Sequence, residues 1–380
     1  METYPKVKPA LARAWRDADT VQFGVTPARA ALFGPLDPAS GSLVEQFDGT
    51  QGMTALRERA RALGLPEGQA DRLVRGLTRS GLVDDVTAGG EAAQSVRGRI
   101  ELMERLRPDL GSLSLLRQEP GGALRALAAR RSVRVQVRGL GRVGAVVASA
   151  LSGAGIGRVE VMDGGVVEPG DPVPGGMPPE AVGMRRGPAG EALVRESAPE
   201  RGRRTGPQGE RPEPALALVV AAPRQGLAAH APDPAEAEPW IRSGIPHLYA
   251  GVLESTGMVG PLVLPGATAC AGCMERERVD RDRQWPRLLT QWRSGRSRAG
   301  PSCDLGLAMA VAGLAAAHAL SFLDGELPAS AGVRWEATLP GLEWRRTSVA
   351  AHPECPCGAP VAAEEERPVG RKAAQDTMAG

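Results

Sequence analysis

The sequence predicts an α/β protein with a mostly parallel sheet, and three neighbouring patterns carry this prediction. Valines at 133, 135 and 137 alternate with polar residues, which is typical of a strand. A glycine-rich turn follows at 139–144 and leads into a helix-like stretch at 145–157. A second strand, 158–163, then ends in an aspartate. Strand, glycine turn, helix and strand in this order form a parallel βαβ unit.

Length and charge limit the classes of function. With 380 residues, the chain is long enough for two domains and a large buried core. Its 46 Lys and Arg nearly balance its 44 Asp and Glu, and no basic block indicates nucleic-acid binding as the main role. The only lysines are Lys6, Lys8 and Lys372. The residues between them therefore offer no lysine for phosphate contact or Schiff-base chemistry.

The first residues of the given sequence contain no apolar stretch of the signal-peptide type, so we expect no export signal there. The long apolar run 305–323 could span a bilayer by length. It is rich in Ala and Gly, contains His318, and is flanked by Asp304 and Asp324. We therefore expect a helix buried against a sheet, in a cytoplasmic protein without a membrane role. Five cysteines without an export signal do not suggest a disulfide framework.

Residues 1–90 are expected to form a separate module. Two hairpin-like strands beside three short helices are a winged-helix pattern, and a plain helical cap without a ligand is the alternative. Arg72, Arg75 and Arg79 lie on the third helix, but nearby acids make nucleic acid the weaker interpretation. The expected strands are 20–25 and 29–36, and the expected helices are 41–47, one from Thr50 or Thr54 to Leu63, and one from Pro66 to Gly81.

Residues 91–131 are expected to be a connector of one or two amphipathic helices, with Ile100, Leu102, Met103 and Leu106 on one side. The main domain then covers 132–358, and a disordered tail covers 359–380. A long, poorly ordered crossover is expected at 169–214, with one helix near 190–196. The remaining expected elements are strands at 216–220, 247–252 and 259–264, the helix 304–323, and a hairpin of 332–338 with 342–348.

The glycine turn is the first motif that could carry chemistry. Gly139 would permit the tight turn, Gly141 would let the backbone approach a phosphate, and Gly144 would let helix and strand pack closely. The following helix N-terminus favours an anion, and Asp163 could bind ribose hydroxyls. This pattern predicts a Rossmann-like fold. The alternative to bound nucleotide is a Rossmann-like core kept for its architecture.

Two close cysteine pairs form the second motif. Cys270 and Cys273 make a CxxC, and Cys355 and Cys357 make a CxC. Pairs far apart in the sequence usually supply a closed structural zinc site, so we expect these four thiolates to hold zinc. His352 is a substitute ligand in this interpretation. A redox CxxC or free core thiols are the alternatives, and a Rossmann oxidoreductase would leave the pairs without a role.

The fifth cysteine and the isolated histidines give weaker signals. Cys303 precedes the long helix, where a helix N-terminus can lower a thiol pKa, so it is a candidate nucleophile. A small buried residue at this point is the favoured alternative. His230 in a loop, His247 at a strand start and His318 on the buried helix are expected to be structural, since no HxH or HExxH pattern exists.

These motifs together resemble a known superfamily. GLGRVG (139–144), VEVMDGGVVE (159–168), a cysteine pair, the helix 301–320 and a second cysteine pair occur in the order of the ThiF/MoeB/E1-like adenylyltransferases. Residues 245–288 and HPECPCG (352–358) look like the ThiF-type cyclodehydratase C proteins of thiazole/oxazole-modified microcin (TOMM) clusters. This resemblance implies that residues 1–90 are a RiPP recognition element that captures a precursor's leader peptide as an added strand. It also implies a YcaO-type cyclodehydratase partner and a homodimer.

Departures from the superfamily pattern bear on the activity. The resemblance implies Asp163 as the first of two aspartates, but Gly165 stands at the second position. The fourth strand, 218–223, ends without its carboxylate, and a site without it should bind Mg-ATP poorly. We therefore favour a non-adenylating scaffold that presents a peptide to a partner enzyme. The alternative is an ATP-dependent adenylyltransferase acting on a peptide or carrier-protein C-terminus. Arginine stands where the superfamily pattern has a lysine that contacts phosphate. The residues that the resemblance then implies for nucleotide binding are Gly139, Gly141, Arg142, Gly144, Asp163, Arg185 and Arg186.

Overall fold

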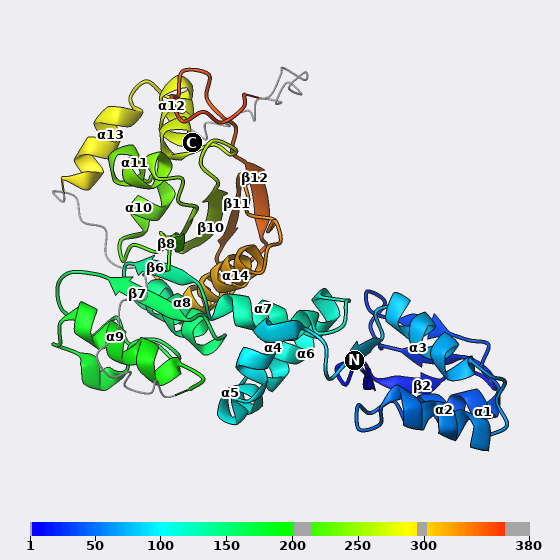
Figure 1. The fold of residues 1–380 in the computed structure, drawn as a ribbon. Helices are drawn as coiled ribbons and strands as arrows, with labels where there is room; N and C mark the ends of the chain where they lie inside the picture. The colour runs from blue at the N-terminus through cyan, green and yellow to red at the C-terminus, as the bar shows by residue number, and fades with distance from the viewer. Residues whose placement is uncertain (1, 201–213, 295–301, 362–380) are drawn as a thin grey trace.

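The fold was analysed in a computed structural model that describes residues 2–200, 214–294 and 302–361. An N-terminal module is joined through a set of short helices to a larger α/β body (Figure 1). Each part has its own cluster of buried apolar side chains. The division into a module of residues 1–90, a connector of residues 91–131 and a main domain of residues 132–358 stays a prediction.

The N-terminal module packs three helices on a three-stranded antiparallel sheet of order β2–β3–β4. Val21 and Phe23 of the central strand are buried in its core. A separate two-stranded sheet pairs the first and last strands of the module. The elements are β1 (Pro5–Val7), β2 (Arg13–Trp15), β3 (Val21–Phe23), β4 (Ala31–Phe33), α1 (Pro38–Val44), α2 (Met53–Ala62), α3 (Gln69–Arg79) and β5 (Val83–Asp85).

Both predicted strands and all three predicted helices of this module are present. The prediction that Thr50 or Thr54 caps the second helix was wrong, because α2 begins after Gly52, which provides no side-chain cap. Strands β1 and β2 were missed because three residues are too few to show an alternating pattern. The winged-helix assignment itself stays a prediction.

The connector contains four helices, so the expectation of one or two was wrong. Gly98 ends the first helix and Pro108 lies in the first turn of the third, and each interrupts what would otherwise be one amphipathic stretch. Leu102 and Leu106 are buried as expected, whereas Ile100 is 72% exposed and lies outside the apolar side. The helices are α4 (Gly90–Arg97), α5 (Ile100–Arg105), α6 (Arg107–Leu116) and α7 (Gly122–Arg130).

The main domain is built on a seven-stranded sheet of order β12–β11–β10–β9–β8–β6–β7. The four strands at the β7 end are parallel, and the last three strands run antiparallel. Its strands are β6 (Arg134–Arg138), β7 (Arg158–Met162), β8 (Leu216–Ala221), β9 (His247–Leu253), β10 (Thr256–Val263), β11 (Val333–Thr338) and β12 (Arg345–Ser348).

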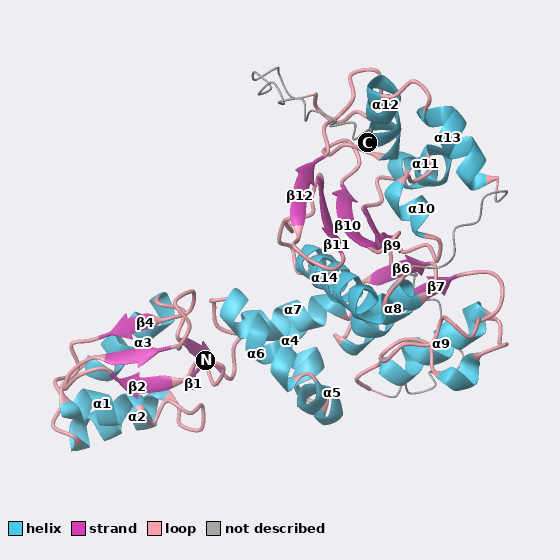
Figure 2. Ribbon diagram, turned by 180° about the vertical axis from the view of Figure 1, so that it is seen from behind, coloured by secondary structure: helices cyan, strands magenta, loops and turns pink. Residues whose placement is uncertain are grey.

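Helices cover the sheet in two layers. Helices α8, α9 and α14 lie on one side, and α10 to α13 lie on the other (Figures 1 and 2). The helices of the domain are α8 (Arg142–Gly153), η1 (Pro179–Ala181, a 3₁₀ turn), α9 (Arg186–Ser197), α10 (Gly226–His230), α11 (Pro234–Arg242), α12 (Ala271–Arg281), α13 (Trp285–Arg293) and α14 (Leu305–Leu323).

Helix α14 is the predicted apolar helix. Among the described residues it is the one helix long and apolar enough, by length and composition, to cross a membrane. Its buried face packs on β9, β10 and α8, which confirms the expectation of a core helix against a sheet. The Asp304 side chain accepts a hydrogen bond from the Leu307 amide and so caps the N-terminus of the helix.

The strands predicted between residues 133 and 348 are all present, including the antiparallel hairpin of β11 and β12. Helices α10 to α13 were not predicted, and His230 ends α10 instead of lying in a loop. The crossover carries η1 and a helix longer than predicted, α9, while its residues 201–213 lie outside the described residues. The tail prediction, apart from residues 359–361, also falls outside them.

Candidate functional site

The glycine turn lies between β6 and α8 at the carboxyl ends of the parallel strands. Gly139 has φ +94°, a conformation that L side chains rarely adopt. A Cβ on Gly144 would lie 1.9 Å from the carbonyl oxygen of Gly139, so helix and turn approach each other closely. Gly141 is the N-cap of α8. The tight turn expected at Gly139 and the close packing expected at Gly144 are therefore present, and the phosphate contact expected at Gly141 stays a prediction.

Asp163 follows β7 directly and faces the turn. Its Oδ2 accepts a hydrogen bond of 2.6 Å from the backbone amide of Leu140, within the glycine turn. Its other oxygen, Oδ1, lies 3.6 Å from Nη1 of Arg186. Asp163 thus braces the turn, and the structure brings it together with the glycines as the sequence predicted.

Arg142, the first residue of α8, is held by two backbone carbonyls. Its Nε donates to Gly170 at 2.7 Å, and its Nη1 donates to Cys303 at 2.8 Å. Cys303 itself is half-buried. Burial raises the pKa of the Cys303 thiol, although the nearby Arg142 acts in the opposite direction. The environment therefore favours the thiol over the nucleophilic thiolate.

Sequence reasoning missed a network of ion pairs beside the turn. Arg186 is buried and its Nη2 lies 3.0 Å from Oδ2 of Asp171. Arg224 binds the other oxygen of Asp171 through Nε at 2.8 Å and also pairs with Glu168. Burial would raise the pKa of Asp171, but hydrogen bonds from Arg224, the Glu168 backbone and Arg186 lower it below its usual range. Arg185, by contrast, is exposed.

Arg224 also lies against the glycine turn. A Cβ on Gly141 would meet the Cγ of Arg224 at 3.1 Å and its Cα at 3.3 Å. Arg224 comes three residues after β8, at the strand end where the sequence showed no carboxylate. The position of Arg224 at the end of this strand was the sequence signal that could have identified it as a site residue. Asp171 gave no such signal, because it lies in a loop rich in Pro and Gly.

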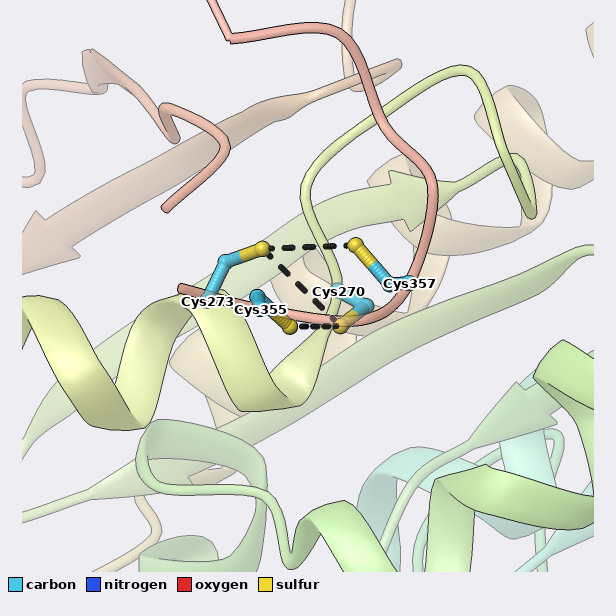
Figure 3. A group of neighbouring side chains, drawn as sticks. All are labelled: Cys270, Cys273, Cys355 and Cys357. Carbon is cyan, nitrogen blue, oxygen red and sulfur yellow. Dashed lines mark hydrogen bonds between the residues drawn. The ribbon is translucent and has the colours of Figure 1, made fainter. Parts of the chain in front are cut away.

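The four predicted cysteines converge between the start of α12 and the segment after β12 (Figure 3). Their sulfurs all lie within 4.8 Å of one another, with Cys270–Cys355 at 3.6 Å and Cys273–Cys357 at 3.5 Å. Tetrahedral coordination at about 2.3 Å from a metal places sulfurs about 3.8 Å apart. The cluster could therefore hold a metal ion.

Two further observations fit a metal at this cluster. A Cβ on Gly272 would meet Sγ of Cys355 at 3.1 Å and Sγ of Cys270 at 3.5 Å, so only glycine leaves this cradle open. The hydrogen bond between Cys270 and Cys273 raises the pKa of Cys270 and lowers the pKa of Cys273 to about 4. A thiolate is thus favoured before any cation binds.

His352 does not join the cysteines. Its Nε2 lies 2.9 Å from a carboxylate oxygen of Asp280, and its Nδ1 accepts a hydrogen bond from the amide of Glu354 at 3.2 Å. Both ring nitrogens therefore have protein partners. The donor set is the four sulfurs that the spacing predicted, without the substitute histidine.

Solved structures share this architecture. E. coli MccB with ATP superposes with a TM-score of 0.63 at 15% identity, covering 94% of this chain and 99% of that chain. The microcin C7 biosynthetic enzyme MccB with N-formylated MccA gives 0.64 at 14%, covering 94% and 100%. PaaA gives 0.63 at 15%, covering 90% and 99%. At these identities the likeness concerns the fold.

Sequence comparison gives the family. No curated protein matches the sequence. The ThiF family model matches residues 120–357, which is more than half of the chain and includes the glycine turn, the ion-pair network and all four clustered cysteines. This chain therefore belongs to the ThiF family, within the ThiF/MoeB/E1-like superfamily.

Proposed function

We propose that this protein is a non-adenylating ThiF-family scaffold that binds a precursor or leader peptide and presents it to a YcaO-type or other modifying enzyme. The observation that carries the proposal is the position of Arg224. The resemblance implies a metal-binding carboxylate at the end of the fourth strand. In this chain a guanidinium follows that strand and lies on Gly141.

Charge balance supports the loss of Mg-ATP chemistry. Three carboxylates, Asp163, Glu168 and Asp171, are paired with the guanidiniums of Arg186 and Arg224. Carboxylates that are already paired with arginines are poor ligands for Mg²⁺. Arginines that are already paired with carboxylates likewise bind a triphosphate weakly. Mg²⁺ would therefore have to displace an arginine from each of these carboxylates.

Pyrophosphate exchange tests this part of the proposal. We expect no ATP–pyrophosphate exchange above background in the wild-type protein with or without a peptide substrate. Robust exchange that Asp163→Ala abolishes would contradict the proposal and establish the adenylyltransferase alternative. The tight geometry of the glycine turn, with Gly139 at φ +94°, is the observation that favours this alternative.

Peptide binding is assigned to the N-terminal module. Strand β4 is an edge strand that pairs only with β3 in the described sheet, so its other edge is free to accept an added strand. Its Phe33 lies on Gly76 of α3, where a Cβ would meet the ring at 3.2 Å, so the helix runs close to this edge. An extended peptide beside β4 would therefore contact α3 as well. A solved structure of the microcin C7 biosynthetic enzyme MccB is a complex with N-formylated MccA, which agrees with a bound partner in this fold.

Photo-crosslinking of the full chain tests this assignment. A photoreactive residue at Leu32 of β4, which is 56% exposed, should capture a leader-like peptide encoded near the gene. The same residue at Leu327, which is 72% exposed in the main domain, is the matched control and should not capture it. Equal capture at both sites, or capture at neither by any such peptide, would refute binding at β4.

We also infer that the cysteine cluster holds structural zinc and that the protein is a homodimer. Four sulfur ligands with no open position favour zinc in a structural role.

For the dimer, the support is the exposure of Arg138 and Met162 on the parallel strands β6 and β7, because such strands are normally covered on both faces. Light scattering should give a dimer mass for the wild type and a monomer mass for Met162→Glu. A monomeric wild type would refute the dimer.

A further inference from the structure

Two arginines converge on one carbonyl oxygen on the side of the sheet opposite α14. Arg278 of α12 donates to the carbonyl of His230 through Nη2 at 2.5 Å, and Arg334 of β11 donates to the same oxygen at 2.9 Å. Arg334 is only 6% exposed. His230 is the last residue of α10, and α10, α12 and α13 lie on the same side of the sheet (Figure 1).

These guanidiniums share one close ion pair. Nη1 of Arg334 lies 3.7 Å from Glu336, but within the described residues no carboxylate lies within 4.0 Å of Arg278. Burial, and then the charge of Arg334, lower the pKa of Arg278 to about 10, while Glu336 and Glu275 act in the opposite direction from a greater distance. Buried charges in proteins are normally paired directly, and here buried Arg334 and partly buried Arg278 have one such pair between them.

Hydrogen-bond donors at the same place also lack acceptors. Nε of Arg334 and Nε1 of Trp285 are buried and have no hydrogen-bond partner among the described residues. Trp285 belongs to this group because the Arg278 guanidinium lies 5.2 Å from its ring centroid and the His230 ring lies 6.4 Å away. Both orphaned groups can only donate, so the partner they lack is an acceptor.

We propose that Arg278, Arg334 and Trp285 form a binding site for an oxyanion, a carboxylate or phosphate group of a ligand that also carries an apolar body. The anion supplies the missing acceptors and places a negative charge in direct contact with the guanidiniums. The apolar body contacts Trp292, whose ring lies 5.7 Å from that of Trp285 and which is 43% exposed. This site is independent of the proposed scaffold role.

NMR of the tryptophan side chains tests the site in the full-length protein. The Nε1–H signal of Trp285, assigned through Trp285→Phe, is followed during titration with inorganic phosphate, acetate and benzoate, with chloride as the ionic-strength control. We expect saturable shifts for the oxyanions, with benzoate binding more tightly than acetate because of Trp292. If phosphate binds and neither carboxylate does, the ligand class is phosphate. The absence of any saturable shift beyond that of chloride would overturn the proposal.

Matched variants on one helix sharpen this test. Arg278→Gln should weaken anion binding by roughly tenfold to a hundredfold, the range expected for a lost charge-assisted hydrogen bond. Arg278→Lys, which keeps the charge, should recover part of the loss. Arg281→Gln removes an exposed arginine of α12 that pairs with Glu277, and should bind as wild type. Equal affinity of Arg278→Gln and wild type would overturn the assignment even if the signal shifts.

His230 gives a second readout. Burial and the charges of Arg278 and Arg334 lower its pKa to about 4. A bound anion offsets the two arginine charges, so the pKa of His230 should rise when phosphate or benzoate saturates the Trp285 shift. A pKa that stays unchanged at saturation would place the anion elsewhere and contradict the proposed site.

Discussion

The ammonium group of Lys8 donates a hydrogen bond to the carbonyl oxygen of Ser114 at 2.6 Å, and this contact joins the N-terminal module to the connector. Lys8 is 1% exposed and also reaches the carbonyls of Arg117 and Gln118 at 3.4 and 3.3 Å. These carbonyls lie at the C-terminal end of α6, where a cation is favoured by the helix dipole. The position of the module relative to α6 therefore depends in part on this buried lysine, beside Arg29, whose Nη1 donates to the carbonyl of Leu115 at 3.1 Å.

Substitution of this lysine should loosen the junction. Lys8→Met keeps the length of the side chain but leaves buried carbonyls without a donor, which costs about 1–3 kcal/mol. We expect a lower free energy of unfolding and faster proteolysis between the module and α6. Lys6→Met, on the partly exposed residue two positions earlier, is the control and should stay within about 0.5 kcal/mol of wild type. Equal proteolysis of both variants would contradict the role of Lys8.

Local patterns explain which parts of the site could be predicted from the sequence. The glycine turn and the CxxC depend on spacings of a few residues, so Gly139, Gly144 and Cys270 could be identified directly. The partners of Asp171 could not, because Arg224 lies 53 positions away and its pairing depends on the packing of β8 beside the crossover.

The same reasoning applies to the fold. Long alternating or apolar runs such as β6 and α14 were predicted, whereas the short strands β1, β2 and β5 and the short α10 were not. Burial of Lys8 follows from a contact 106 positions away, which no local pattern encodes. Sequence composition only showed that lysines are rare, so a buried one was unexpected.

Arg130 and Asp324 should make the strongest charged contribution to the joint between connector and main domain. Two hydrogen bonds of 2.7 and 2.6 Å join them, and their side chains are 7% and 6% exposed. Arg130→Met leaves a buried carboxylate unpaired, and we expect a loss of about 3–5 kcal/mol in denaturant unfolding. Arg125→Met breaks the exposed pair with Glu119 and should cost about 0–1 kcal/mol. Similar losses for both variants would show that the Arg130 pair contributes little.

The close approach at the glycine turn predicts a strong effect of one methyl group. In Gly144→Ala the new Cβ would overlap the carbonyl oxygen of Gly139, so we expect a loss of at least about 2 kcal/mol in unfolding free energy. Gly153→Ala lies on the same helix, and its Cβ would meet only the Ser197 carbonyl at 3.6 Å. This control should gain about 0.5–1 kcal/mol from the lower chain entropy of alanine. A neutral Gly144→Ala would refute the tight packing of α8 on the turn.

Acid should destabilise the protein through His247. Burial lowers the pKa of His247 to about 4, although the Ile245 carbonyl opposes the shift. The unfolded chain takes up this proton near pH 6.5 and the folded chain does not, so stability falls as the pH decreases from about 6.5 to about 4. The full effect is about 3 kcal/mol. Unfolding at pH 7 and pH 4.5 should show a smaller acid loss in His247→Phe than in wild type, and an identical loss would refute this assignment.

Loss of one cysteine ligand should release the C-terminal segment from α12. Cys270 and Cys273 at the start of α12 meet Cys355 and Cys357, and in the described residues these sulfurs form the metal-type cluster that joins the two segments. Cys273→Ser removes one thiolate, so we expect elemental analysis to show loss of zinc and proteolysis to cleave near residues 349–361 at a higher rate. Binding to a structural site stabilises the fold directly, so the melting temperature should also fall.

Two comparisons separate this effect from general damage to the fold. Cys303→Ser removes the cysteine outside the cluster and should retain stoichiometric zinc. A strong chelator added to the wild-type protein should reproduce the proteolysis pattern of Cys273→Ser without any substitution. If wild-type protein contains no zinc, or if the chelator leaves the C-terminal segment protected, then contacts such as the His352–Asp280 pair at 2.9 Å hold this segment and the metal does not.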